Sequence, residues 1–237
     1  MTQRKRVLLV FILLAVLLVT GCGKSWWPFG KRVDMGRATP ESLYQQGLAY
    51  YEDKDYKRAV EVFQHVRELY PLSELAIMAE IGIADSYYSG GEYPEAQLAY
   101  GEFINLHPTN ENLPYVIYQL GMSHFNQIDT IDRDLTEGLR ALKEFERLVT
   151  RFPDSRFAAL AEKMARDCKK ILAEKEFYVG EFYFKNSHYK AALRRFEKVV
   201  REYPNVGIDF KVNTYIQETR RRLAEAEAKA KPVAAKK

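Results

Sequence analysis

Residues 47–71 read GLAYYEDKDYKRAVEVFQHVRELYP, and this stretch decides the fold because its pattern returns three times further along the chain. A small residue, an aromatic residue, an alanine, a second aromatic residue and a proline follow one another at fixed intervals. The same intervals recur in residues 84–108 and in residues 180–204. A further copy, in residues 121–153, carries about eight extra residues between its two halves. A pattern repeated in this way indicates one structural unit used several times.

The recurring positions fit a pair of packed helices. They are Leu43, Gly47, Tyr50, Ala59, Phe63 and Pro71; Ile83, Ala84, Tyr87, Ala96, Tyr100 and Pro108; Leu120, Gly121, Ala141, Phe145 and Pro153; and Gly180, Tyr183, Ala192, Phe196 and Pro204. Small residues let the two helices touch, large aromatic residues fill the space between repeats, and the proline ends the second helix. This is the tetratricopeptide pattern of two helices in about 34 residues. We therefore predict an all-α, tetratricopeptide-repeat superhelical solenoid of about ten helices.

The segments after the third proline depart from the regular repeat. Residues 154–185 have apolar residues at helical spacing and predict one long helix, straight or kinked, with Asp154 and Ser155 able to cap its start. Residues 208–230 predict a charged terminal helix whose arginines, at positions 220–222, lie on the solvated side. We assign residues 40–228 to the repeat domain and expect residues 229–237 to form a disordered tail.

The N-terminus has the features of a lipoprotein signal. Basic residues at positions 4–6 precede an apolar run over residues 7–19, which is shorter than the roughly 20 residues that a membrane-spanning helix needs. The sequence VTGC that follows, ending at Cys22, resembles the lipobox of bacterial lipoproteins. We therefore predict a lipoprotein signal peptide over residues 1–21 and a lipidated flexible linker over residues 22–39. The alternative is an ordinary secretory signal with an incidental cysteine.

The predicted lipid anchor lies on Cys22, with a diacylglycerol on the thiol and an acyl chain on the freed amine, and we predict no other cofactor. Gly23 follows the cysteine, where an aspartate would favour retention at the inner membrane, so we expect the outer membrane, with the body in the periplasm. Trp26 and Trp27 follow closely. They would lie either at the lipid headgroups, which indoles favour, or on the first repeat.

Charge and motif content argue against nucleic-acid binding and catalysis. The chain carries a net charge of +4, and three of these charges precede residue 21, so the mature part is nearly neutral. Its histidines (His65, His107, His124 and His188) are scattered, and no hydrolase or phosphate-loop motif is present. The acidic residues between positions 129 and 134 lack the spacing and the glycine of a calcium loop, so we predict a solvated or arginine-paired loop. A disulfide between Cys22 and Cys168 is conceivable but needs close, aligned Cβ atoms. We predict no metal site.

A stripe on the first helix of each repeat is aromatic where a solvated groove should be polar. The stripe comprises Tyr44, Leu48, Tyr51, Ile81, Asp85, Tyr88, Tyr115, Tyr118, Met122 and Phe125. Contiguous apolar surface usually marks a contact site, so we predict a peptide-binding groove. The alternative for any single residue is packing under the linker or a neighbouring repeat. The Lys/Asn set with which some tetratricopeptide co-chaperones bind a peptide carboxylate is absent, since Tyr44 and Leu48 stand where it would start.

The lipobox followed by this repeat array resembles the BamD (ComL) family, the lipoproteins of the outer-membrane β-barrel assembly machinery. The more specific segments are HPT at 107–109, YVIYQLG at 115–121, DRD at 132–134 ahead of RAL at 140–142, LVTRFP at 148–153 and EFYVGEFY at 176–183. The linker segment SWWPF, at residues 25–29, departs from the family's pattern. The resemblance covers nearly all of the mature chain.

The resemblance implies a membrane-anchored scaffold rather than an enzyme. Its N-terminal repeats would bind unfolded outer-membrane protein precursors through an aromatic-rich C-terminal signal. Its C-terminal repeats would dock on the periplasmic domains of the BamA barrel protein, alongside other lipoproteins of the machinery, with Arg194 and Arg195 as docking candidates. A guanidinium suits an interfacial carboxylate, and the alternative for Arg195 is a solvated side chain. Two other functions stay open: a generic periplasmic tetratricopeptide lipoprotein serving cell-wall or division complexes, and a lipoprotein with hydrolase activity.

Overall fold

The structure is a computed structural model that describes residues 38–130 and 133–234, the last five of these by their backbone only. Every regular element in this part of the chain is an α-helix. The helices are α2 (Pro40–Glu52), α3 (Tyr56–Leu69), α4 (Glu74–Ser89), α5 (Tyr93–Leu106), α6 (Leu113–Phe125), α7 (Thr136–Arg151), α8 (Ala158–Lys185), α9 (Tyr189–Glu202) and α10 (Asp209–Ala234). None of these described helices is long and apolar enough to cross a membrane.

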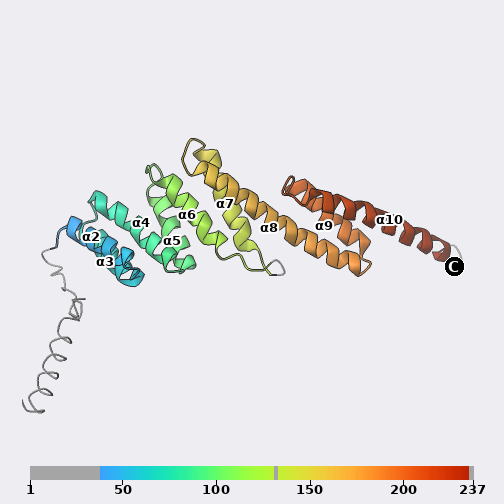
Figure 1. Ribbon diagram of the computed structural model, residues 1–237, viewed down its shortest axis with the longest axis horizontal. Coiled ribbons are helices and arrows are strands. Elements are labelled where there is room, and N and C mark those ends of the chain that lie inside the picture. Colours follow the sequence, from blue (N-terminus) through green and yellow to red (C-terminus); the bar gives the residue numbers. More distant parts are fainter. Residues whose placement is uncertain (1–37, 131–132, 235–237) are drawn as a thin grey trace, which may run out of the picture. The chain divides into compact units, whose positions relative to one another are not determined.

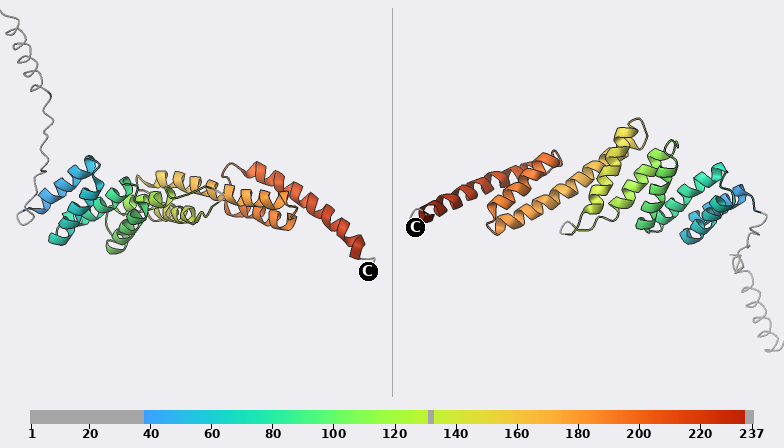
Figure 2. Two further views of the ribbon diagram at one scale, coloured as in Figure 1. Left: turned by 90° about the horizontal axis from the view of Figure 1, so that it is seen from below. Right: turned by 180° about the vertical axis from the view of Figure 1, so that it is seen from behind.

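Each helix packs against the next one in the sequence, as all views of the chain show (Figure 1; Figure 2). The pairs α2–α3, α4–α5 and α6–α7 are the first three repeats. The first helix of a repeat also contacts that of the following one, since α2 touches α4 and α6 touches α8. This arrangement confirms the predicted all-α tetratricopeptide fold.

The close approach of a glycine and a phenylalanine sets the spacing of three helix pairs, α2–α3, α6–α7 and α8–α9. A Cβ atom added at Gly47 would lie 2.6 Å from Cε1 of Phe63, and one added at Gly121 would lie 2.6 Å from Cε1 of Phe145. Gly180 has the same relation to Phe196. The phenylalanine rings are fully buried. The small residue of the repeat is therefore required because the ring of the partner helix occupies the space where a side chain would be.

The prolines end the second helices as predicted. α3, α5, α7 and α9 each stop two residues before a proline of the repeat pattern. The residue before each proline has left helical geometry, with φ between −124° and −134° and ψ between 54° and 60°. Proline disfavours helical geometry at the preceding residue, so the chain turns toward the next repeat at this point.

The turns between paired helices repeat an unusual backbone conformation. Lys54, Gly91 and Ser187 occupy the same position of their repeats and have φ values of 62°, 79° and 61°. At the residue after Lys54, the N–H of Asp55 donates to the carbonyl of Tyr50 at 2.9 Å, and this bond closes the turn. Left-handed backbone is free of steric cost only for glycine, so the first and fourth repeats bear a cost that the second does not.

Replacing Lys54 with glycine is therefore expected to stabilise the protein by roughly 0.5–1 kcal/mol, since relief of the left-handed strain exceeds the added freedom of the unfolded chain. Urea unfolding followed by circular dichroism measures the change. Gly91→Ala serves as the reverse control, because no atom lies within 4 Å of the added Cβ and only the backbone is tested. A stabilising Gly91→Ala variant would contradict the interpretation.

The boundaries of the last helices differ from the sequence prediction. The long helix is unbroken but begins at Ala158 rather than at residue 154, because Ser155 forms a turn in which its Oγ accepts from the N–H of Phe157 at 3.2 Å. The predicted capping by Asp154 and Ser155 is wrong, since Phe157 is the N-cap residue and no side chain caps this helix.

The terminal helix runs further than predicted. It starts at Asp209 and continues to Ala234, so residues 229–234 are helical and the prediction of disorder is wrong for them; residues 235–237 lie outside the described part. Arg221 pairs with Glu218 at 2.7 Å and with Glu225 at 3.1 Å, and such pairs three and four residues apart stabilise an exposed helix. Arg220, Arg221 and Arg222 are exposed, as predicted.

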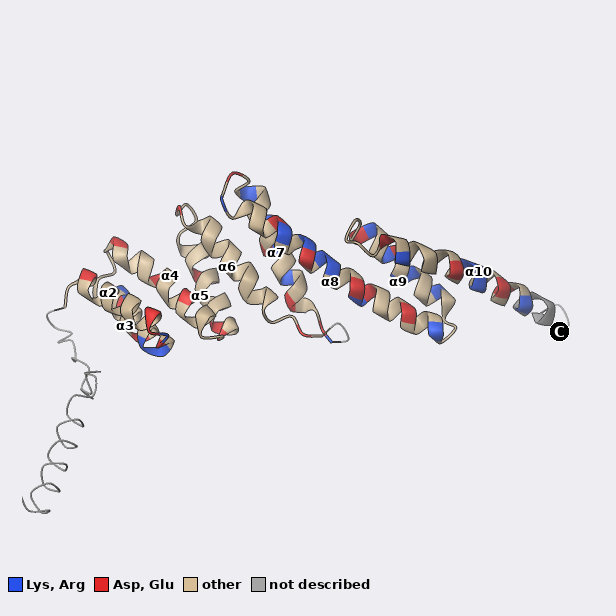
Figure 3. Cartoon of the chain, viewed as in Figure 1, with Lys and Arg blue, Asp and Glu red and all other residues tan. Residues whose placement is uncertain are grey.

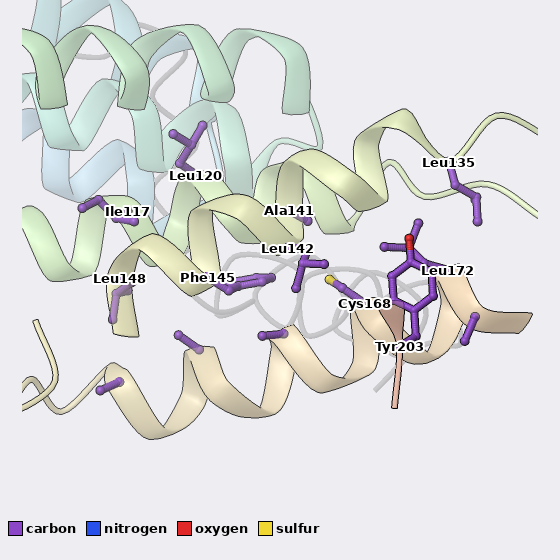
Figure 4. Packing of buried hydrophobic residues seen from close by; sticks show 14 of the residues in the cluster. Ile117, Leu120, Leu135, Ala141, Leu142, Phe145, Leu148, Cys168, Leu172 and Tyr203 are labelled. Carbon is purple, nitrogen blue, oxygen red and sulfur yellow. The ribbon is translucent and has the colours of Figure 1, made fainter. Parts of the chain in front are cut away.

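The core continues through α8, which joins the third repeat to the fourth. Figure 4 shows Leu142 and Phe145 of α7 pointing toward α8, from which Cys168 faces back into the same cluster. Cys168 is a free, fully buried cysteine. Burial raises the pKa of its thiol to about 12, so it stays protonated and serves as a small apolar side chain.

Candidate functional site

A cavity of about 420 Å³ opens among the first helices of the first three repeats. Its walls come from α2, α3 and α4, from the α5–α6 loop with the start of α6, and from the loop before α8. The lining residues are Tyr44, Leu48, Tyr51, Phe63, Met78, Ile81, Gly82, Asp85, Glu111, Asn112, Pro114, Tyr115, Ser155, Arg156 and Phe157. We call this cavity the aromatic groove.

Six of the ten residues predicted to line a groove are in it: Tyr44, Leu48, Tyr51, Ile81, Asp85 and Tyr115. They meet because side chains three, four and seven residues apart share one face of a helix. All are half-buried except Ile81, which is buried. The structure thus brings together the predicted stripes of the first two repeats and the start of the third.

The other four predicted residues lie outside the cavity. Tyr88 packs edge-on against Tyr93 and accepts a 2.9 Å hydrogen bond from Asn126. Tyr118 packs on Phe145, with ring centroids 5.9 Å apart, and is half-buried. Met122 and Phe125 are half-buried against the main apolar core. These four side chains therefore pack within the repeat array in the described structure. Contact with a neighbouring repeat, the alternative for single residues of the stripe, occurs at Tyr88 through Asn126.

A half-buried carboxylate, that of Asp85, lies in the wall of the groove. Oδ1 of Asp85 accepts hydrogen bonds from the hydroxyls of Tyr100, at 2.5 Å, and Tyr115, at 2.8 Å. None of the described residues donates to Oδ2 of Asp85, and this oxygen keeps accessible surface on the groove. Burial raises the pKa of Asp85, although the two hydroxyls oppose this effect by donating to the charged form. Burial and the nearby Asp85 charge also raise the pKa of Tyr44.

The sequence prediction missed the contribution of the loop before α8. Phe157 lies with its ring centroid 5.6 Å from that of Tyr115, and the guanidinium of Arg156 lies 4.8 Å from the centroid of Phe157. These residues are outside the repeat pattern and far in sequence from the other walls. No spacing rule could have placed them, because their position depends on how the third repeat packs on α8.

A second group of charged residues lies on α8 and α9, where Figure 3 shows blue and red residues along both helices. Glu176 pairs with Arg195 at 2.9 Å and with Lys198 at 2.5 Å. Burial opposes ionisation of Glu176, but these two cations outweigh it and hold the pKa of the carboxyl below its usual value. Arg194 is exposed and makes no ion pair among the described residues, and both arginines line a hollow of about 400 Å³. Of the two docking candidates, Arg194 is thus the unengaged one.

The remaining candidate features do not form a catalytic site in the described residues. His107 and His124 each contact a carboxylate, Glu80 at 2.7 Å and Glu137 at 2.6 Å, on separate repeats. The loop at 129–134 is arginine-paired, since Arg133 binds Asp129 at 2.6 Å. No cluster of potential metal ligands occurs within the ranges that the structure covers. Cys22, Trp26 and Trp27 lie outside the described residues.

Comparison with known proteins shows to which protein family this chain is related. The family model described as "YfiO: Outer membrane lipoprotein" matches residues 37–234. "Outer membrane protein assembly factor BamD" of Rickettsia prowazekii is 32% identical over 68% of this chain and 64% of its own length, and the protein of that name from Neisseria meningitidis serogroup B is 30% identical over 70% and 66%. The matched region therefore spans slightly less than two thirds of these relatives.

Among solved structures, a tetratricopeptide protein of Thermus thermophilus is similar with a TM-score of 0.41 and 15% identity, covering 76% of this chain and 98% of that one. These curated relatives carry the name of an outer membrane protein assembly factor, which agrees with the function class predicted from the sequence. The resemblance noted in the sequence is confirmed: the chain belongs to the YfiO family of outer membrane lipoproteins, whose curated members carry the name BamD.

Proposed function

We propose that this lipoprotein holds segments of unfolded outer-membrane protein precursors in the aromatic groove while they are passed to the assembly machinery. The single observation that carries this proposal is the groove itself, a cavity of about 420 Å³ walled by aromatic side chains from three repeats and the loop before α8. The relatives' name, outer membrane protein assembly factor, supplies the class of client.

The groove suits an unfolded membrane strand chemically. Strands of outer-membrane barrels carry aromatic residues at the edges of their apolar band, and such side chains need apolar contact before the barrel closes. Tyrosines offer large contact areas with a hydroxyl at the tip and lose little entropy on binding. Tyr44, Tyr51 and Tyr115 therefore present a surface that takes many aromatic sequences rather than one.

We further propose that α9 docks on the periplasmic part of the barrel protein, a BamA-type partner, and that other lipoproteins of the machinery share the complex. Arg194 and Arg195 would pair there with carboxylates of that partner. Cys22 would carry the lipid that holds the protein at the periplasmic face of the outer membrane. No nucleic acid takes part in this function.

A charge placed in the groove tests the first proposal. Leu48→Glu puts a carboxylate among the aromatic side chains, and we expect it to weaken binding of a fluorescent peptide from the last strand of a barrel protein at least about tenfold, since desolvating that charge costs several kcal/mol. Leu98→Glu is the matched control, because Leu98 is 67% exposed on α5 and does not line the groove. Fluorescence anisotropy on the full chain in detergent gives both affinities. Equal affinities for the two variants would refute the proposal.

A second variant tests the docking proposal. Arg194→Glu reverses an exposed charge that has no ion-pair partner among the described residues, so we expect the barrel protein to co-purify at a much lower yield while the fold is kept. Arg195→Ala should act less selectively, because it also leaves Glu176 with only Lys198. Arg67→Glu makes an equal charge change at an exposed position of α3 and is the control. A normal yield with Arg194→Glu would remove α9 from the interface.

A further inference from the structure

Only one of the two carboxylate oxygens of Asp85 accepts hydrogen bonds from the described residues. Two phenol hydroxyls donate to Oδ1, from Tyr100 and Tyr115, so this oxygen carries no proton and is fully engaged. Oδ2 accepts from none of the described residues and keeps accessible surface, and Asp85 lines the aromatic groove, so this oxygen is open to a ligand. A charged group that is half-buried has lost part of its hydration, and an opposite charge that pairs with it compensates for that loss. The carboxylate is thus an acceptor held in place for a ligand.

The rest of the groove suits a cation. Its walls carry the rings of Tyr44, Tyr51, Tyr115 and Phe157, and aromatic faces attract cations, most strongly where water is excluded. The chain itself uses this contact at Arg156, whose guanidinium lies 4.8 Å from the centroid of the Phe157 ring. Among the charged residues in the lining, Asp85 and Glu111 outweigh Arg156. Aromatic rings around a fixed carboxylate form an environment that stabilises a positive charge.

We propose that the aromatic groove selects a basic side chain, arginine or lysine, within the bound precursor segment, and pairs it with Oδ2 of Asp85. This proposal rests on the proposed function and specifies which side chain of the bound segment the groove recognises. The aliphatic part of such a side chain contacts Leu48 and the rings, while its charged end reaches the carboxylate, as long basic side chains commonly do.

Two other ligand groups fit less well. A free C-terminal carboxylate entering the groove would meet the like charge of Asp85 and would lose its hydration without gaining a partner there. A tyrosine hydroxyl could donate to Oδ2, but it is neutral and would leave the half-buried negative charge uncompensated. The basic side chain supplies both the hydrogen bond and the opposite charge, which makes charge-assisted bonds the stronger kind.

The test uses three heptapeptides with blocked ends and alternating aromatic residues, which differ only in a central arginine, citrulline or tyrosine. Citrulline has nearly the shape of arginine without its charge. We expect the arginine peptide to bind the full chain in detergent about 10- to 100-fold more tightly than the citrulline peptide. Fluorescence anisotropy measures the ratio.

Asp85→Asn should bring that ratio close to one. The asparagine oxygen still accepts from Tyr100 and Tyr115, while its amide nitrogen, a donor, replaces the free oxygen. Glu95→Gln is the matched control, since Glu95 is exposed on α5, lies outside the groove lining, and loses the same charge. It should leave most of the ratio intact. Thermal melting by circular dichroism shows whether each variant keeps its fold. If Asp85→Asn does not fold, the comparison of the arginine and citrulline peptides on the unmodified chain still tests the proposal.

The outcomes distinguish failure of this proposal from failure of the proposed precursor-binding function. Equal binding of arginine and citrulline peptides, abolished by Leu48→Glu, would keep the proposed function and overturn the selection of a basic side chain. Tightest binding of the tyrosine peptide would overturn it in favour of a neutral donor. A ratio that persists in Asp85→Asn would overturn the role of the carboxylate. Failure of all three peptides to bind would refute the proposed function itself.

Discussion

The Cys22→Ala variant is expected to lose the membrane anchor completely and to leave the outer-membrane fraction. Without the thiol no diacylglycerol can be attached, and each buried CH₂ of an acyl chain contributes about 0.8 kcal/mol, so two or more chains hold a protein stably where none holds it at all. Cell fractionation with immunoblotting measures the distribution. A retained signal peptide would show at the same time as a slower band on the gel.

Cys168→Ala provides the control for this experiment. It removes the chain's other cysteine, which is buried in the core and far from any role in anchoring. That variant should stay in the outer membrane and be processed normally. An outer-membrane Cys22→Ala protein of normal size would show that the lipobox interpretation is wrong and that another segment binds the membrane.

The sequence predicted the repeat fold well because the determining contacts are local and recur. Gly47 must be small since Phe63 of the next helix lies against it, and both belong to one helix pair separated by a short turn. Helix ends follow equally local rules, as the prolines show. Interactions of this kind leave a fixed spacing in the sequence, and the spacing is the same in every copy.

The groove was only partly predictable because some of its walls come from outside the repeat pattern. Helical spacing placed Tyr44 and Asp85 on the inner stripe, yet it gave no sign that two hydroxyls hold that carboxylate. It also gave no sign of Phe157, whose position depends on where the long helix begins. Tyr118 lies outside the cavity because it packs on Phe145 of its own repeat and on Phe157 before the long helix. Non-local contacts of this kind leave no periodic trace.

The end of the chain illustrates a different limit. Leu223 and Val233 are the only large apolar residues after Ile216, so apolar periodicity gave no reason to continue the predicted helix past residue 230, and a disordered tail was expected from residue 229. Charged pairs such as Arg221 with Glu218 support the helix instead. These contribute only a few tenths of a kcal/mol each, and a rule based on apolar periodicity does not register them.

Phe145→Ala is expected to destabilise the protein by about 3–5 kcal/mol, because the ring is fully buried and its removal leaves a cavity between α6 and α7. The ring also packs against Tyr118, whose side chain would lose its neighbour. Urea unfolding followed by circular dichroism measures the loss. Phe182→Ala, at a ring that is 59% exposed on α8, should cost far less.

The partner of that ring gives a stricter test of the same packing. An alanine at Gly121 gains about 1 kcal/mol of helix propensity, but its Cβ would lie 2.6 Å from the Phe145 ring, and overpacking of this kind costs about 1–3 kcal/mol. We expect a net loss at Gly121 and a gain at Gly101, another helical glycine whose added Cβ would meet no atom within 4 Å. In a Phe145→Leu background the loss at Gly121 should shrink or reverse, since directly contacting residues are not additive. If Gly121→Ala cost the same in both backgrounds, the contact with the ring would not be the reason for this glycine, and the spacing rule that identifies the repeat would need another cause.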